Sequence, residues 1–366
     1  MDVIDCFSAN YAEARQKFLL ACQSASAHVD IQVTSIDHPL TGPDGGALAT
    51  DVATLGDPAA KHVLLLNSGT HGNEGFCGSA CLIDWLRQRR YLDLPSNVRV
   101  VLSHAINPHG FAHVRRVTED NVDLNRNFLD HSAPHPVNAD YPAIHDLLIP
   151  KEWTGKARAE ADAGLEAFAA EHGTFALQAA ISRGQYSHPD GMFFGGQAPT
   201  WSNSTFRHIL RTFVAPATLV GFIDYHTGLG PYGSPELIAE SAPGQPPYDR
   251  ALAWYGHGIT SSDDGSSASP SLAGTIKGAL IQELPDAEVV TVAAEFGTRE
   301  VKRVINGLRG DHWLHNNPGA DPALARDIKA AIRDGLYPDE DDWKEVVALR
   351  SRQFLTRAVR GLAEGI

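Results

Sequence analysis

The chain has 366 residues, of which 43% are hydrophobic and 20% are charged, a composition typical of a soluble globular protein. Its formal net charge of −14 argues against nucleic acids and anionic membrane surfaces as partners, because both attract clustered lysine and arginine. Four cysteines are too few for a disulfide scaffold, so we expect free, mostly buried thiols in a reducing compartment.

The N-terminal segment Met1–Ala27 lacks the basic start and apolar core of a secretory signal. The sequence also has no apolar run as long as a membrane span. We therefore expect a soluble, cytoplasmic protein; the sequence leaves its oligomeric state open.

The first segments predict a helix and a hairpin. Ala9–Ala25 carries apolar residues at helical spacing, and Val29–Ile36 alternates apolar and polar residues as a half-buried strand does. A glycine- and proline-rich turn, Thr41–Gly46, separates this strand from a second one near Ala47–Thr54.

The middle of the chain has the pattern of an α/β sheet. His62–Asn67 is a continuous apolar run, which suits a strand buried on both faces, and a helix is expected over Glu74–Arg89. Three more strands are predicted at Asn97–Ala105, Thr218–Tyr225 and Val289–Phe296. Strands separated by helical segments indicate a sheet with helices on both sides.

The remaining segments suggest an insertion and a helical tail. A helix is expected at Ala157–Ala170, followed by an ordered loop in which Tyr186 and His188 could line a substrate pocket. Ser261–Gly274 is predicted as a surface loop, and Asp339–Leu362 as a helix. We expect one domain over residues 1–366, with an inserted region at about 130–215 and a helical tail at about 320–366.

The buried run His62–Asn67 leads directly to a candidate metal-binding pair. His71 and Glu74 lie three residues apart where a strand passes into a helix, and flanking glycines permit a sharp turn. Side chains at the carboxyl end of a parallel strand point into the crevice where α/β enzymes bind ligands. Taken alone, the pair also fits the polar first turn of an ordinary helix.

Three later segments add groups of matching chemistry. Asn125 and Arg126 stand side by side and suit a substrate carboxylate, although a solvated loop with salt bridges would have the same composition. His226 and Glu295 each follow an apolar strand; the simpler interpretations are a core histidine and a solvated strand end. Four such segments beside buried strands are hard to explain together by chance.

In this order the motifs resemble the zinc carboxypeptidase superfamily, which includes the succinylglutamate desuccinylase and aspartoacylase branch. The resemblance covers about residues 60 to 300 and looks like a bacterial branch. Its most specific part is the string Val122–Phe128. The matching pattern is His71-x-x-Glu74, Asn107-Pro-x-Gly110, Arg116, Asp123-x-Asn125-Arg126, His226 and Glu295.

The resemblance implies a mixed, mostly parallel eight-stranded sheet between helices, an α/β/α sandwich. It implies one Zn²⁺ held by His71, Glu74 and His226, with a water molecule in the open position. Asp123 would fix the imidazole of His71 from behind.

The resemblance also implies roles in catalysis. Asn125 and Arg126 would bind the substrate carboxylate, and Glu295 would act as general base and then general acid. Arg116 would stabilise the oxyanion. Arg115 is adjacent and is the alternative; we prefer Arg116 because its place ahead of Asn125 is more like related bacterial enzymes.

The sequence departs from the family in two places. Peptide-cleaving relatives usually carry a tyrosine shortly before the catalytic glutamate, but none occurs between Tyr255 and Glu295. The possible substitutes, none of them convincing, are Tyr225, Tyr232, Tyr248 and Tyr255. The aspartoacylase branch adds a C-terminal β-rich domain, whereas this tail is helical. We therefore expect a zinc-dependent hydrolase that cleaves an amide bond. Its substrate would be a peptide or an N-acyl amino acid with a free carboxylate. The alternative is a metal- or ligand-binding protein without catalysis.

Overall fold

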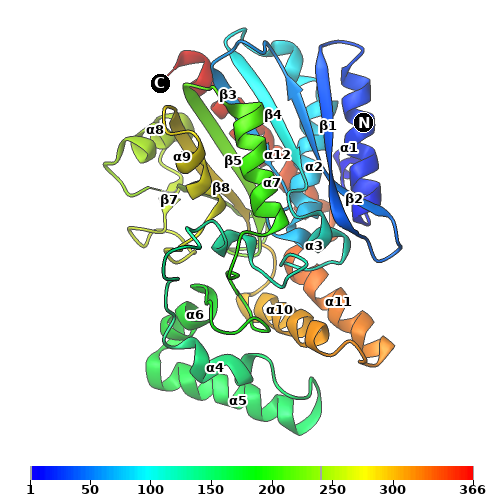
Figure 1. Cartoon of the computed structure of the whole chain (residues 1–366), viewed down its shortest axis with the longest axis vertical. Coiled ribbons are helices and arrows are strands. Elements are labelled where there is room, and N and C mark those ends of the chain that lie inside the picture. The colour runs from blue at the N-terminus through cyan, green and yellow to red at the C-terminus, as the bar shows by residue number, and fades with distance from the viewer. Residues whose placement is uncertain (1, 240, 366) are drawn as a thin grey trace.

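A computed structural model describes residues 2–239 and 241–365, and its strands form one mixed eight-stranded sheet in the order β1-β2-β4-β3-β5-β8-β6-β7 (Figure 1). The strands are β1 (Ile31–Thr41), β2 (Ala47–Leu55), β3 (His62–Asn67), β4 (Val98–His104), β5 (Leu219–Thr227), β6 (Pro235–Ala239), β7 (Ile259–Ser261) and β8 (Glu288–Phe296).

Helices cover both faces of this sheet and extend beyond one end of it (Figure 1). The α-helices are α1 (Tyr11–Ala25), α2 (Gly75–Arg87), α3 (Pro108–Ala112), α4 (Tyr141–Leu148), α5 (Gly155–His172), α6 (Thr174–Ser182), α7 (Trp201–Ile209), α8 (Pro246–Tyr255), α9 (Ile276–Glu283), α10 (Val301–Asn316), α11 (Pro322–Leu336) and α12 (Asp341–Glu364). Shorter helical turns are η1 (Val3–Cys6), η2 (Gly72–Glu74), η3 (Arg90–Asp93), η4 (Leu124–Arg126) and the π-helical η5 (Leu210–Val214).

Four parallel strands, β4, β3, β5 and β8, form the centre of the sheet. The hairpin of β1 and β2 adds antiparallel strands at one edge, while β6 pairs antiparallel with β8 and carries β7 at the other edge. The α/β sandwich predicted from the motifs is confirmed. Because the central strands are parallel, their carboxyl ends lie at one edge of the sheet, where ligands bind in α/β folds.

Alternation along β3 shows how the two faces are filled. Leu64 and Leu66 pack into a core formed with α1, α2, α8 and α12, whereas Val63 and Leu65 pack into a second core formed with α7, η5 and α9. Successive strand residues point to opposite faces, so a continuous apolar run is needed where helices cover both sides.

The segment between β4 and β5 builds a separate helical region. Figure 1 shows α4, α5 and α6 beyond the lower end of the sheet, next to α10. A third apolar core joins these helices to α10 and α11, with Tyr141, Leu165, Leu308 and Ile332 among its members. This helical region therefore covers the edge of the sheet at which β3, β5 and β8 end.

Several predicted elements differ from the observed ones. The sequence did not predict the short edge strands β6 and β7, and the segment Ser261–Gly274, expected as a surface loop, contributes to the wall of the main cavity. The four cysteines are free and buried, as expected.

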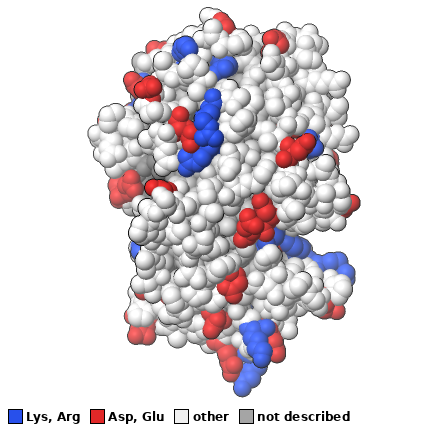
Figure 2. Space-filling view, viewed as in Figure 1, with Lys and Arg blue, Asp and Glu red and all other residues white. Residues whose placement is uncertain are grey.

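The charge distribution on the surface and the apolar character of the helices both bear on possible partners. Acidic and basic side chains are interspersed over the face drawn in Figure 2, without a broad basic patch there. Within residues 2–239 and 241–365, we find no helix with both the length and the apolar character needed to cross a membrane.

Candidate metal centre and substrate cavity

A tight turn at the end of β3 carries the first two candidate metal ligands. Gly69 adopts a positive φ of 72°, which glycine tolerates without strain. A Cβ at Gly72 would lie 2.1 Å from the backbone of Gly110, so the turn and α3 approach more closely than any side chain allows. This contact holds His71 and Glu74 at the carboxyl edge of the sheet.

Three ligand-type side chains converge at this edge. His71 Nδ1 lies 2.9 Å from Glu74 Oε1 and 3.2 Å from His226 Nδ1, and His226 Nδ1 lies 3.0 Å from Glu74 Oε2. All three residues are buried, and they are the group of described residues that meets the geometry of a metal site. Ligands at tetrahedral zinc stand about 3.3 Å apart, so these separations and the two-imidazole, one-carboxylate chemistry fit Zn²⁺.

A carboxylate lies behind each imidazole. His71 Nε2 is 3.4 Å from Asp123 Oδ1, and His226 Nε2 is 2.6 Å from Asp224 Oδ2. Asp224 is itself held by hydrogen bonds from Thr70 Oγ1 at 2.8 Å and Asn67 Nδ2 at 2.8 Å. A carboxylate that accepts a hydrogen bond from Nε2–H leaves the Nδ1 lone pair for a metal, and the short Asp224 contact places His226 in this arrangement.

Arg116 joins this centre, whereas Arg115 points away from it. Arg116 donates to Glu74 Oε1 and Asp123 Oδ2, both at 2.9 Å, and its Nη2 lies 2.8 Å from His71 Nε2. Arg115 is buried against Asp311, to which its Nε donates at 2.9 Å. Of the two arginines, Arg116 is therefore the one that lines the cavity.

Charge compensation favours the ionised forms of Glu74 and Asp123. Burial opposes ionisation of Glu74, but the neighbouring His71, His226 and Arg116 hold its pKa below the usual range. Burial likewise opposes ionisation of Asp123, and the charge of Arg116 leads the groups that hold its pKa well below that range.

Glu295 lies beside the triad on β8, in register with His226 on β5. It is 8% exposed, and its Oε1 accepts the backbone N–H of Leu229 at 3.0 Å. Burial, followed by repulsion from Glu74, raises the pKa of Glu295 to about 7. A carboxyl group with such a pKa can take up and release a proton near neutral pH.

Asn125 and Arg126 lie in η4, close to the cavity. Asn125 Oδ1 accepts the N–H of Ile276 at 2.8 Å, so its Nδ2 is the group that can donate to a ligand. Arg126 donates to the carbonyls of Asn125 at 2.9 Å and Ser182 at 2.6 Å, and its Nε has no hydrogen-bond partner among the described atoms. A guanidinium has five N–H donors, so donors remain for a substrate carboxylate.

The ring of Phe193 lies between the two arginines. The guanidinium carbons of Arg116 and Arg126 are 5.2 and 5.5 Å from its centroid, distances that suit cation–π contacts. Phe193 adopts a φ of 53°, a strained conformation for a bulky residue that is found mostly at functional sites.

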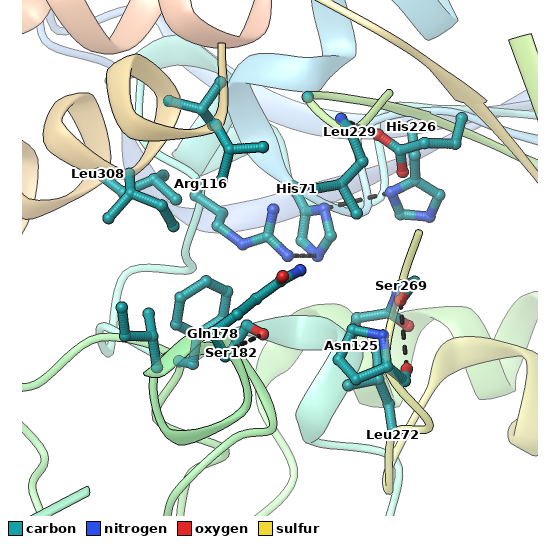
Figure 3. A pocket seen from close by; sticks show the side chains of 18 of the residues that line it. His71, Arg116, Asn125, Gln178, Ser182, His226, Leu229, Ser269, Leu272 and Leu308 are labelled. Carbon is teal, nitrogen blue, oxygen red and sulfur yellow. Dashed lines mark hydrogen bonds between the residues drawn. The ribbon is translucent and has the colours of Figure 1, made fainter. Parts of the chain in front are cut away.

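Seven of these residues line one cavity of about 520 Å³ (Figure 3): His71, Arg116, Asn125, Arg126, Phe193, His226 and Glu295. None of the described residues that line it is a tyrosine. The prediction that Tyr186 and His188 line the pocket was wrong: Tyr186 instead donates to the carbonyl of Arg126 at 2.6 Å, behind the cavity wall.

Sequence comparison gives this chain a family. Residues 7–350 match the family described as "Protein of unknown function (DUF2817)". The chain belongs to the DUF2817 family. Among curated proteins, none matches this DUF2817 chain.

Two solved structures resemble the DUF2817 chain. Carboxypeptidase A from Helicoverpa armigera is 13% identical with a TM-score of 0.54, and the match covers 99% of this chain and 75% of that chain. Bovine thrombin-activatable fibrinolysis inhibitor, solved with a tick carboxypeptidase inhibitor, is 10% identical with a TM-score of 0.50, and the match covers 98% of both chains. At these identities the likeness shows the fold alone, and it confirms the resemblance to the zinc carboxypeptidase superfamily at that level.

The sequence did not single out two residues of the DUF2817 site. Asp224 could have been found, because residues two apart on a strand point to the same face and His226 had already been selected. Phe193 carries no such signal, since its place between Arg116 and Arg126 depends on the folding of a long loop.

Proposed function

We propose that this DUF2817 protein is a zinc-dependent hydrolase that cleaves an amide bond in a substrate with a free carboxylate. The observation that carries the proposal is the convergence of His71 Nδ1, Glu74 and His226 Nδ1 beside Glu295, at one cavity. A binding protein needs the three ligands but has no use for a buried carboxylate beside them.

The ligands would be His71, Glu74 and His226, and one Zn²⁺ fits their separations. When bound, Zn²⁺ supplies a Lewis acid that polarises a carbonyl and makes water acidic near neutral pH. Asp224 would hold the His226 tautomer that exposes Nδ1, and Asp123 would orient the imidazole of His71.

The other roles follow from position. Glu295 takes a proton from the attacking water and then passes it to the leaving nitrogen. It serves as the acid as well as the base because none of the described residues that line the cavity is a tyrosine. Arg116 donates toward the oxygen of the scissile carbonyl as negative charge develops on it. Asn125 and Arg126 bind the free carboxylate.

The test uses the full chain, stripped of metal by a chelator and reconstituted with one equivalent of Zn²⁺. A panel of dipeptides and N-acyl amino acids is assayed for release of the free amine. We expect turnover of at least one class with zinc and none without it. If the protein binds zinc but hydrolyses no amide, the non-catalytic alternative replaces this proposal.

A further inference from the structure

The cavity has two walls of different character on either side of the candidate metal centre. Figure 3 shows Leu308 to the left of Arg116, Gln178 and Ser182 below it, and Ser269 and Leu272 to the lower right. We name these the helical wall, from α5, α6 and α10, and the loop wall, from residues 262–277. The polar groups of the loop wall are Ser262, Asp263, Ser269, Ser271, Thr275 and Lys277.

The helical wall carries apolar side chains at helical spacing, and its uncharged polar groups are Thr174, Gln178, Ser182 and Asn306. Leu177 and Ile181 lie four residues apart on α6, and Val304 and Leu308 lie four apart on α10, so each pair occupies one face of its helix. Leu165 of α5 completes this surface. The same residues, Leu177 included, belong to or pack against the third apolar core, so the cavity opens directly onto that core.

The charged groups on the helical wall already have partners of opposite charge. Asp162 pairs with Arg309 at 2.7 Å, and Glu166 pairs with Lys302 at 3.2 Å. Arg309 also donates to the carbonyls of Leu147 and Leu148, at 2.7 and 2.9 Å. A second carboxylate on the substrate would therefore lose its hydration here without gaining a free cation, which is costly.

We propose that the acyl half of the substrate is a large apolar group that lies along the helical wall. The amino-acid half, with its carboxylate, then lies toward Asn125 and Arg126. This inference rests on the proposed function. In the reaction the C–N bond breaks, the water oxygen bonds to the acyl carbon, and one water proton reaches the nitrogen, which releases an apolar carboxylic acid and a free amino acid.

Burial of aliphatic groups gives the expected trend. Each buried methylene contributes about 0.8 kcal/mol, which corresponds to about fourfold in kcat/KM at most. An apolar acyl group can be a fatty-acyl chain or the first residue of a dipeptide, and the same wall could accommodate either. A succinyl group carries the second carboxylate that this wall disfavours.

The experiment compares acyl groups on the zinc-loaded protein. Acetyl, hexanoyl, dodecanoyl and succinyl derivatives of alanine, phenylalanine, glutamate and lysine are assayed beside dipeptides with an N-terminal leucine. We expect kcat/KM to rise from acetyl to dodecanoyl and succinyl derivatives to be the poorest; faster turnover of the leucine dipeptides than of the dodecanoyl derivatives would assign the apolar group to a peptide residue. If acetyl or succinyl derivatives are preferred, this inference falls while the proposed function stands; if nothing is hydrolysed, the proposed function itself fails.

Matched variants on α6 locate the effect. Leu177→Trp fills the helical wall and Leu177→Asp makes it polar, whereas Phe175→Trp changes a side chain on the same helix that is 77% exposed. Both Leu177 variants should lower kcat/KM for the dodecanoyl substrate about tenfold more than for the acetyl one, and Phe175→Trp should change neither. An unchanged chain-length preference in both Leu177 variants would overturn the inference.

Discussion

His226 and Glu295 are register partners on the adjacent parallel strands β5 and β8. Because paired residues of neighbouring strands lie on the same face of a sheet, a candidate metal ligand and the candidate general base leave the sheet side by side. The two roles are nonetheless separated, since His226 Nδ1 turns to Glu74 while Glu295 accepts the Leu229 N–H.

Replacing Glu295 by glutamine should abolish proton transfer without loss of the metal. We expect kcat for the best amide substrate to fall by about 10²- to 10⁴-fold, while metal analysis still finds one zinc per chain. The matched control is Glu288→Gln at the exposed start of the same strand, which should keep full activity. Loss of zinc in Glu295→Gln would instead make this residue a ligand.

The rate should fall on the acid side as Glu295 becomes protonated. Its folded-state pKa is raised from 4.5 to about 7, so the base form is lost as the pH falls through the shifted value. A bound dication favours the ionised form, which places the acid limb of kcat/KM between these two values. The limb should vanish from the residual activity of Glu295→Gln; an acid limb that persists there would assign the titration to another group.

Asp224→Asn should weaken metal binding through His226. The amide can donate to Nε2 and so favour the tautomer that blocks Nδ1, and loss of such a carboxylate typically lowers metal affinity by about 10- to 100-fold. Competition with a fluorescent zinc chelator measures this change. Asp286→Asn, an exposed change on the loop before β8, should leave the affinity untouched. Equal affinities in all three proteins would argue against the His226 Nδ1 ligand.

Substitution of Arg115 should change the stability of the protein, whereas substitution of Arg116 should change its activity. Arg115→Met leaves the buried Asp311 with Lys329 alone, which should lower the free energy of unfolding by about 3 kcal/mol with kcat unchanged. Arg116→Lys loses the forked donor geometry, so kcat should fall by about 10²-fold. Urea unfolding and steady-state kinetics on both proteins separate the effects, and the reverse pattern would restore Arg115 as the oxyanion donor.

The sequence predicted the centre of the sheet because burial on two faces imposes a continuous apolar run. The continuous apolar run His62–Asn67 is typical of a central strand. Polar groups directly after such runs indicated a site, because they lie at the carboxyl ends of the parallel strands. The edge strands β6 and β7 gave no comparable signal, since they are short and Pro235 begins one of them.

The helical wall could not be predicted. Leu177 and Leu308 lie on helices far apart in the sequence, and each has the pattern of an ordinary core residue. Only the packing of α5, α6 and α10 leaves a space between them that a ligand can fill. The motifs at the strand ends thus predicted the candidate catalytic groups, whereas the sequence did not predict the shape of the cavity.

The four buried cysteines make the chain suitable for site-specific labelling. Burial raises the pKa of Cys6 to about 11 and that of Cys22 to about 12, and it also raises that of Cys77, so these three thiols form little thiolate near neutral pH. Cys81 is only 2% exposed and is therefore poorly accessible to a reagent. A maleimide probe should therefore react selectively with one cysteine introduced at the exposed Phe175. A fluorophore placed there would report whether α6 moves when a substrate enters, with all native cysteines left in place.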